Sequence, residues 1–327
     1  MNQPSTRPPP RPQPFEADGA IDGILNVDKP AGITSMDVVR RIKRASRQKR
    51  VGHGGTLDPF ATGVIPVCMG QATRMMEYLI EGGKEYRGVV ELGVETDTYD
   101  STGEAVASAD TSGITQDQVT ATLAGFDGTI EQVPPMYSAL KRQGQRLYTL
   151  ARAGIEVERE PRKVEVFRAV LEDWMPPLAT IYVSCSRGLY MRSLAHDLGQ
   201  KLGCGGHLKS LVRLRSGPFK IEESVTLDEA ERAFASASWG QLLHPPDAVL
   251  SDLRAVVVNR KIEERVRQGQ ALPVGLRMAP SQPEEPARVY SAEGRFLAVI
   301  AFNAASGQWQ PTKVFDIRHI DSALVRA

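Results

Sequence analysis

Apolar and polar residues follow one another along this chain in patterns that predict both strands and helices. The apolar run GILNVDKP stops at a proline turn and predicts a strand, and four other runs are of the same kind: VIPVCMG, EYRGVVELG, VEVFRAVLED and ATIYVSCS. Helices are predicted where apolar residues recur every three or four positions. Because strands and helices alternate without a regular βαβ rhythm, the pattern indicates an α+β fold built on a sheet.

Capping signals mark where several helices start. Thr34 and Asp37 in TSMD resemble a capping box ahead of an apolar stripe at helical spacing, and Thr226 and Glu229 in TLDE form another. Further helices are predicted over residues 72–83, 114–126 and 188–203. Helical spacing alone also predicts that Leu211 is a core residue.

The length of 327 residues indicates a larger domain and a smaller one. Residues 1–20 are proline-rich and are expected to form a disordered tail. The sequence HPPD suggests a boundary, so that residues 21–245 form the main domain and residues 246–327 a β-rich module. Within the module, strands are predicted at RAVVVN, ARVYS, FLAVIAF and KVFDI, and a helix at RKIEERVRQG.

Composition excludes several classes of protein. With 41% hydrophobic and 24% charged residues and no apolar run long enough to span a bilayer, the chain is expected to be soluble and to have no membrane partner. Cys68, Cys185 and Cys204 are widely separated, which argues against a disulfide framework and favours a reducing cytoplasm. Cys204 and His207 have the spacing of a ligand pair, but a second pair is not recognisable, so no metal site is predicted.

Positive charge is gathered in two stretches although the formal net charge is only +1. The first runs from Lys141 to Lys163, and the second, from Lys201 to Lys220, contains no acidic residue. Such clusters suit contacts with phosphate groups. They are equally typical of a solvated surface balanced by acids elsewhere, and charge alone does not decide between the two.

The stretch VGHGGTLDPFATGVIPV, residues 51–67, has two interpretations. Asp58 followed by Pro59 is a favoured start for a helical turn. The bare backbone of the nearby glycines and the predicted strand behind them would equally suit a reactive carboxylate on a rigidly held loop. His53, taken alone, is typical of a turn or packing residue. The chain contains no Ser-His-Asp signature, P-loop or Rossmann fingerprint.

Six segments resemble one known family. GHGGTLDPFATGVIPVCMGQATR closely resembles the catalytic motif of the TruB family of tRNA pseudouridine synthases, and the other five lie in family order within residues 23–219: GILNVDKPAGITS, KEYRGVVELGVETDTYDSTGE, PPMYSALKRQGQRLYTLARAG, SCSRGLYMRSLAHDLG and GGHLKSLVRLRSGPF. The resemblance implies the pseudouridine synthase fold, a central mixed and mostly antiparallel sheet flanked by helices. The C-terminal module resembles a PUA domain, which is a small RNA-binding β-barrel.

The family converts uridine 55 in the T loop of tRNA into pseudouridine without a cofactor. The resemblance implies that Asp58 is the nucleophile, that Arg192 pairs with it and that Tyr86 stacks on the target base. Tyr190 and Leu211 match residues that line the uridine pocket, and His53 matches a histidine that inserts into the loop once the base is flipped out.

The family also has an RNA-binding insertion, which corresponds here to residues 134–163. Its basic residues, expected to contact the tRNA backbone, include Lys141, Arg142, Arg146 and Arg152. The expected partner is tRNA, through its T stem-loop, and we expect a monomer with no obligate protein partner. Two alternatives stay open: a non-catalytic tRNA-binding chaperone, and a guide-dependent synthase of the box H/ACA type. The segment QGQRLYTLARAG resembles the stand-alone tRNA enzymes more than the guide-dependent ones.

Overall fold

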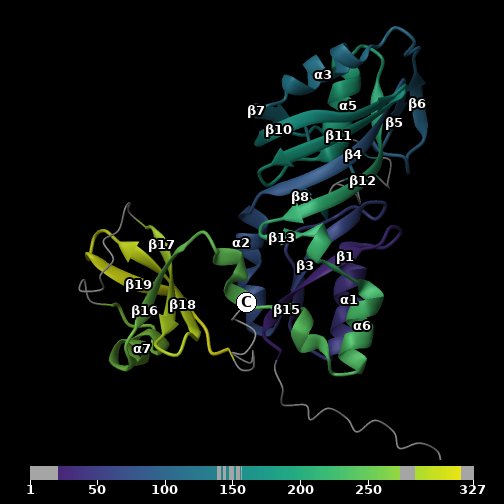
Figure 1. The fold of residues 1–327 in the computed structure, drawn as a ribbon. Helices are drawn as coiled ribbons and strands as arrows, with labels where there is room; N and C mark the ends of the chain where they lie inside the picture. Colours follow the sequence, from purple (N-terminus) through teal and green to yellow (C-terminus); the bar gives the residue numbers. More distant parts are fainter. Residues whose placement is uncertain are drawn as a thin grey trace, which may run out of the picture.

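A long mixed sheet forms the larger part of the molecule (Figure 1). The computed structural model describes residues 21–137, 141–142, 145–146, 151, 155, 157–272 and 284–317. The strands of the large sheet are β1 (Gly23–Lys29), β2 (Val51–His53), β3 (Thr62–Met69), β4 (Lys84–Leu92), β7 (Gly128–Gln132), β10 (Arg162–Met175), β11 (Leu178–Cys185), β12 (Gly206–Ser216), β13 (Phe219–Lys220), β14 (Val225–Thr226) and β15 (Leu243–His244).

The order of these strands is β14-β1-β3-β12-β4-β11-β10-β7, with β13 beside β12, β15 beside β1 and β2 beside β3. Most neighbours are antiparallel, while β1 with β14 and β3 with β12 pair in parallel. Two short ribbons lie outside this sheet: β5 (Val94–Thr96) with β6 (Ala105–Ser108), and β8 (Lys141–Arg142) with β9 (Gln145–Arg146). The expected α+β class with a mixed, mostly antiparallel sheet is confirmed.

Helices pack on the large sheet, except for α7, which packs on a second sheet. They are α1 (Ser35–Ser46), α2 (Met76–Glu81), α3 (Gln116–Ala124), α5 (Met191–Lys201), α6 (Leu227–Ala235) and α7 (Arg260–Arg267), with the short 3₁₀ turns η1 (Gly70–Met75), η2 (Ile221–Glu223), η3 (Trp239–Leu242) and η4 (Pro246–Leu250). The capping boxes predicted at Thr34 and Thr226 are both present. Each hydroxyl accepts the backbone N–H three residues on, and the acid at that position accepts the backbone N–H of the threonine. The helix predicted over residues 72–83 is in fact η1 followed by α2.

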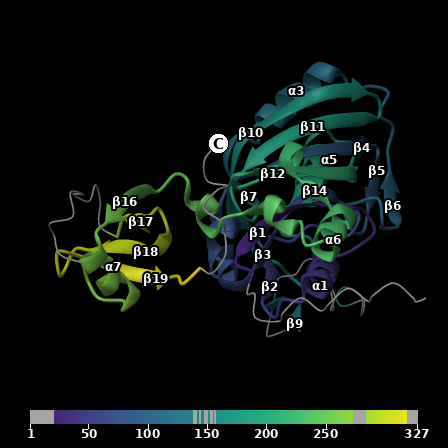
Figure 2. The same cartoon turned by 60° about the horizontal axis from the view of Figure 1, so that its bottom comes forward.

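Apolar clusters on the large sheet fix where the helices lie. One cluster joins α3 and α5 to β4, β10, β11 and β12, and it includes Leu57 and Ala61 from the loop that carries Asp58. Another joins α1 and α6 to β1 and β3, and the two helices run side by side in Figures 1 and 2. The loop with Asp58 is therefore anchored in the core on both sides of the acid.

A second sheet of four strands follows in the chain, in the order β16-β17-β18-β19. Its strands are β16 (Arg254–Val258), β17 (Pro286–Ser291), β18 (Phe296–Asn303) and β19 (Gln308–Val314), and α7 packs on it around the buried Trp309. The strand predicted at KVFDI ends earlier, at Val314. Within the parts of the chain that the structure describes this sheet does not close into a barrel, and the proposed domain boundary at residues 245–246 stays a prediction.

The second sheet lies beside the segment formed by η1 and α2 (Figures 1 and 2). Met75 of η1 lies in an apolar cluster with Phe296 and Phe315, and the Arg74 guanidinium lies 4.6 Å from the centre of the Phe315 ring. Lys313 of β19 donates to the Arg74 carbonyl at 2.7 Å and pairs with Glu77 at 2.6 Å. Apolar and polar contacts therefore hold the second sheet to the η1–α2 segment.

Among the described residues, no helix combines the length and the apolar character that a membrane crossing would require.

Candidate active site

Asp58 lies in a tight turn between β2 and β3. The Ala61 N–H donates to the Asp58 carbonyl at 3.1 Å, with Pro59 in the second position of the turn, where proline is favoured, and the chain enters β3 at Thr62. The interpretation of Asp58 as a helix N-cap is therefore wrong, since no helix begins here. The same proline that suggested a helix start serves a β-turn instead.

Two side chains before the turn in sequence fix its backbone. The Ser35 hydroxyl donates to the Leu57 carbonyl at 3.0 Å and accepts the Leu57 N–H at 2.8 Å. Lys29 at the end of β1 is fully buried, and its Nζ donates to the carbonyls of Pro30, Ile33 and Pro59 at 2.9, 2.9 and 3.2 Å. Burial lowers the pKa of the Lys29 amine to about 8. The strand β1 and the start of α1 thus hold the turn in place.

Arg213 of β12 fixes the glycine-rich approach from the other side. It is 1% exposed, and it donates from Nε to the Val64 carbonyl at 2.6 Å and from Nη2 to the Gly55 carbonyl at 3.2 Å. β3 meets β12 in parallel at Gly63 and Arg213, and there Gly63 has φ +101°. A Cβ on Gly63 would lie 2.3 Å from the Arg213 carbonyl oxygen, so this close approach requires glycine.

Arg192 forms the pair with Asp58 that the family resemblance implied. Its Nε lies 2.9 Å from Asp58 Oδ2, and its Nη2 donates to Asp58 Oδ1 at 3.0 Å. The Arg192 side chain, in the first turn of α5, is 5% exposed, whereas that of Asp58 is 32% exposed. A bidentate guanidinium fixes both the charge and the orientation of a carboxylate. The pair therefore presents a held carboxylate at an opening to solvent.

A second carboxylate, Asp100, faces the same guanidinium. Asp100 Oδ2 lies 3.6 Å from Arg192 Nη1 and its side chain is 5% exposed. Its Oδ1 accepts hydrogen bonds from the Thr98 hydroxyl at 2.8 Å and from the Thr102 N–H at 2.9 Å. Arg192 is therefore shared between two acids.

Opposing effects set the charge of Asp58. Burial raises the pKa of its carboxyl above the ordinary value, and the negative charge of Asp100 adds to that rise, while the Arg192 guanidinium and Lys29 lower it. Arg192 is the larger of the two lowering influences. The Arg192 contact therefore favours the ionised form of the Asp58 carboxyl against the effect of burial.

Tyr86 lies on β4, in the same apolar cluster as Leu57 and Ala61 of the loop that carries Asp58. Its side chain is buried at 9% exposure, it is paired in register with Arg213, and it is hydrogen-bonded to the Arg213 guanidinium. Burial raises the pKa of the Tyr86 hydroxyl. Leu211, 6% exposed, lies in the same apolar cluster as Tyr86 and Leu57. Leu211 belongs to strand β12 and not to a helix, so the helical interpretation of its spacing is wrong, while its place in the core is confirmed.

His53 and Tyr190 lie at the ends of elements around the site. His53 ends β2, is half-buried, and accepts the Gly55 N–H through Nδ1 at 3.3 Å. Burial and the nearby Arg213 lower the pKa of the His53 ring. Tyr190 precedes α5, and its backbone N–H and carbonyl both bond to the Gln132 amide, at 2.8 and 3.1 Å.

The two basic stretches have different outcomes. In the first, the backbones of Lys141, Arg142 and Arg146 form the β8–β9 ribbon, while their side chains and the whole of Arg152 lie outside the described residues. Their role as RNA contacts stays a prediction.

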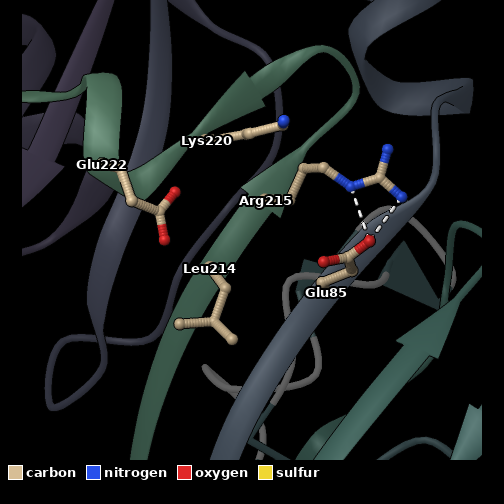
Figure 3. Close-up of a pocket in the computed structure, with 5 residues that line it drawn as sticks. All are labelled: Glu85, Leu214, Arg215, Lys220 and Glu222. Carbon is tan, nitrogen blue, oxygen red and sulfur yellow. Dashed lines mark hydrogen bonds and ion pairs between the residues drawn. The ribbon is translucent and has the colours of Figure 1, made fainter.

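In the second stretch, the buried Arg213 is not available to phosphate, because its donors face backbone carbonyls. Lys209 pairs with Glu91 at 2.8 Å. Arg215 pairs with Glu85 at 2.6 Å beside a hollow of about 510 Å³ that is also lined by Leu214, Lys220 and Glu222 (Figure 3). Glu85 and Tyr86 are successive residues of β4, so this hollow lies on the other face of the sheet from Tyr86.

The Cys204 and His207 side chains are both buried and bonded to backbone carbonyls, the thiol to Gly205 at 3.4 Å and the ring Nδ1 to Val94 at 2.9 Å. Among the residues described, no group of three or more His, Cys, Asp or Glu side chains is arranged to hold a metal ion.

Three residues that shape the site were not singled out from the sequence. Asp100 lies in TDTYDST, where hydroxyl residues on both sides of an acid indicate a carboxylate held by local hydrogen bonds. Lys29 and Arg213 resemble surface cations in a sequence, and burial of such a charge becomes visible only when its carbonyl partners are known.

Comparison with known proteins agrees with this geometry. Residues 43–191 match the model of the TruB family pseudouridylate synthase N-terminal domain, and residues 192–257 match that of the tRNA pseudouridylate synthase B C-terminal domain. The tRNA pseudouridine synthase B of Dehalococcoides mccartyi strain CBDB1 is 45% identical over 295 residues, 90% of this chain and 97% of that protein. The synthase of the same name from Symbiobacterium thermophilum is 50% identical over 259 residues, 78% of this chain and 85% of that protein.

Among solved structures, a chain of a Cbf5-Nop10-Gar1 complex superposes with a TM-score of 0.70 at 26% identity, covering 90% of this chain and 84% of that one. The fold, the matched segments and the sequence identity lead to one conclusion: this chain belongs to the TruB family of pseudouridylate synthases.

Proposed function

We propose that this protein converts uridine 55 in the T loop of tRNA into pseudouridine, acting alone and without a guide RNA. The observation that carries the proposal is the Asp58–Arg192 pair, in which a buried guanidinium holds both oxygens of a carboxylate that is itself 32% exposed. The substrate follows from the relatives, which are named tRNA pseudouridine synthase B.

The reaction is an isomerisation that balances without a cofactor. The bond between the sugar C1′ and N1 of the base breaks, a bond between C1′ and C5 forms, C5 loses a proton and N1 gains one. Asp58 is the nucleophile that carries the substrate between the two bonds, and its first adduct is with either the sugar or the base. Arg192 would hold the carboxylate ionised, and Tyr86 would stack on the base and take part in proton transfer at C5.

The target uridine is stacked inside the T loop and has to be flipped out, at a cost of about a few kcal/mol. His53 is suited to fill the space that the base leaves, because its half-buried ring lies at the end of β2, five residues before Asp58. Tyr190 and Leu211 would then line the pocket that receives the uridine.

Two further parts of the chain, the insertion and the C-terminal module, would also contact the tRNA. The insertion at residues 134–163, with Lys141, Arg142, Arg146 and Arg152, would clamp the backbone of the RNA. The C-terminal module at residues 246–327 would act as a PUA-like domain on the acceptor stem. The protein would work as a monomer in the cytoplasm, with tRNA as its partner.

Two other functions compete with this one. A tRNA-binding chaperone would not need Arg192 to hold Asp58 in two contacts at 2.9 and 3.0 Å. A guide-dependent synthase is suggested by the similarity to the Cbf5-Nop10-Gar1 complex, but the relatives at 45–50% identity are named as tRNA enzymes.

A T stem-loop transcript separates the three possibilities. The purified protein is expected to form pseudouridine on the free stem-loop, and Asp58→Asn is expected to bind the same RNA without forming it. If wild type and Asp58→Asn bind equally and neither reacts, the protein is a chaperone. If activity appears only after a guide RNA is added, the guide-independent assignment is wrong.

A further inference from the structure

Tyr99 has an unusual backbone conformation beside the active site. It lies in the turn that joins β5 to β6, with φ +61°, a region that side chains other than Gly, Asn and Asp rarely adopt. Both of its neighbours contact the guanidinium of Arg192: the Thr98 carbonyl accepts from Nη1 at 3.5 Å and Asp100 Oδ2 lies 3.6 Å from the same nitrogen. The conformation of Tyr99 therefore determines how two Arg192 partners are presented.

The ring of Tyr99 stacks on His196. Their centroids are 4.0 Å apart and their planes differ by 15°. His196 is on α5, four residues after Arg192, so the two side chains lie one turn apart on the same face of the helix. The turn thus contacts α5 at two places one helical turn apart: Asp100 contacts Arg192, and Tyr99 contacts His196.

The stack is not part of the general core. Tyr99 is half-buried and is absent from the apolar clusters that the described residues form. His196 Nδ1 is buried with no hydrogen-bond partner in the described part of the chain, so ring packing holds this histidine where a hydrogen bond does not. The stack therefore holds the two rings against each other without help from the apolar core.

Hydrogen bonds fix the opposite side of the turn. The Leu208 N–H of β12 donates to the Tyr99 carbonyl at 3.0 Å, and the Ser101 N–H donates to the Leu208 carbonyl at 3.1 Å. These bonds hold the backbone to the sheet, and the stack holds the turn against α5. Without the ring, the turn keeps its bonds to β12 and the contacts of Thr98 and Asp100 with Arg192, but it loses the stack that fixes it one turn further along α5.

We propose that the stack of Tyr99 on His196 is a positioning device for the reaction: it sets where Asp100 and Thr98 meet Arg192, and through Arg192 it sets the placement of Asp58. The inference rests on the proposed function, since it concerns the rate of that reaction. Tyr99 and His196 are positioning residues and not catalytic ones, because they act through Arg192.

The test compares Tyr99→Gly with Tyr99→Phe. Glycine accepts the positive φ and removes the ring, whereas phenylalanine keeps the ring and removes only the hydroxyl. We expect Tyr99→Gly and His196→Ala each to lower the single-turnover rate on the T stem-loop by about tenfold or more, since small misplacements near a reacting group have effects of that size. Tyr99→Phe is expected to keep a rate within about twofold of the wild-type rate.

The pH profile supplies a readout that a loss of stability would not move. Asp100 contributes to the raised pKa of Asp58, so Asp100→Asn is expected to shift the acid limb of the profile to lower pH. Tyr99→Gly, which releases Asp100, is expected to shift it in the same direction by less. In the Asp100→Asn background the Tyr99→Gly change is expected to have little further effect on either rate or pH profile.

Trp239→Ala is the matched control, because it removes a stacked ring, the partner of Phe234, at a site remote from the β5–β6 turn. The inference is overturned if Tyr99→Gly keeps the wild-type rate and acid limb, if Tyr99→Phe is as impaired as Tyr99→Gly, or if the effects of Tyr99→Gly and Asp100→Asn simply add. A wild-type protein that forms no pseudouridine overturns the proposed function and this inference together, whereas an active wild type with an unaffected Tyr99→Gly overturns this inference alone.

Discussion

Arg192 binds both carboxylate oxygens of Asp58 across a separation of 134 residues in the sequence. The two residues come from different elements, a turn before β3 and the first turn of α5, and each is fixed independently. Asp58 is held through its neighbours by Lys29 and Ser35, and Arg192 by burial in the core. Both side chains are therefore held by contacts within the protein, and such preorganisation of reacting groups favours a fast reaction.

Arg192→Lys is expected to reduce the single-turnover rate by about a hundredfold or more, because an ammonium group cannot make the two parallel contacts of a guanidinium. Burial already raises the pKa of Asp58, and weakening the Arg192 contact raises it further. The Asp58 carboxyl then loses its charge at a higher pH than in the wild type, so the acid limb of the pH–rate profile moves to higher pH. The measurement is single-turnover pseudouridine formation between about pH 5 and 8.

Arg87→Lys serves as the control, since Arg87 also pairs with an acid, Glu172, but on a largely exposed surface. A profile for Arg192→Lys that coincides with that of Arg87→Lys would contradict the role given to the pair.

Asp100→Asn is expected to lower the rate near neutral pH by about tenfold to a hundredfold, because Arg192 loses the second carboxylate that orients it. Its effect on pH dependence is opposite to that of Arg192→Lys. Removing a negative charge beside Asp58 lowers the pKa of that carboxyl, so the acid limb moves to lower pH. If the acid limb of Asp100→Asn moves to higher pH instead, Asp100 does not act by raising the pKa of Asp58.

Much of this fold could be predicted from the sequence because local rules and the final structure agree. Two such local signals are the capping boxes at Thr34 and Thr226 and the alternating apolar positions of β4. Each depends on a few neighbouring residues, and each is present in the folded chain. Asp58 was ambiguous for a physical reason: an Asp-Pro pair suits a helix start and a β-turn equally well, and only the onward path into β3 decides.

The charged residues were harder to place than the elements. Arg213 lies in an acid-free basic stretch of the kind that suits phosphate contacts, yet it is buried beneath the Asp58 loop. Its burial depends on carbonyls of Gly55 and Val64, which lie 158 and 149 residues away in the sequence. Sequence patterns report a charge but not the partner that permits its burial.

Gly63→Ala is expected to destabilise the protein by about 3 kcal/mol, from the combination of positive φ and a Cβ placed 2.3 Å from the Arg213 carbonyl oxygen. The measurement is the urea midpoint at constant slope. Gly113→Ala is the control, because a Cβ there meets nothing within 4 Å. Equal midpoints for the two variants would show that the β3–β12 contact tolerates a side chain.

Lys29→Met is expected to cost about 2 kcal/mol at pH 7, because three backbone carbonyls lose their common donor. The pKa of Lys29 is lowered to about 8 in the folded protein from an ordinary 10.5. Between these values the unfolded chain binds more protons, so the contribution of Lys29 to stability rises with pH. The difference in unfolding free energy between wild type and Lys29→Met should therefore widen from pH 8 to 10.5, by roughly 2–3 kcal/mol.

The exposed Lys209 supplies the control for that series as Lys209→Met, measured by urea unfolding at each pH. If the gap between wild type and Lys29→Met stays constant or narrows with rising pH, the lowered pKa assigned to Lys29 is wrong.

The last prediction concerns a cationic surface next to His53. Lys43, Arg47, Lys49 and Arg50, on α1 and in the link to β2, are all exposed and form no ion pair with the rest of the described chain. The link ends at β2, whose third residue is His53, so Arg50 and Lys49 lie three and four residues before His53 in the sequence. This position suits contacts with phosphates of the stem that flanks the target loop.

Lys49→Gln with Arg50→Gln is expected to weaken binding of the T stem-loop by about tenfold at low salt and to reduce the slope of log K against log salt by about one for each phosphate that is no longer bound. Binding is measured by titration of labelled stem-loop between about 50 and 200 mM salt. Arg41→Gln also removes a positive charge, from helix α1, but its guanidinium is already held by Asp228 and Glu231 of α6 at 2.7 and 2.6 Å. We expect Arg41→Gln to keep the wild-type salt slope. If the slope changes as much per charge removed in Arg41→Gln as in the double variant, the effect comes from net charge alone. That outcome would contradict specific phosphate contacts by Lys49 and Arg50.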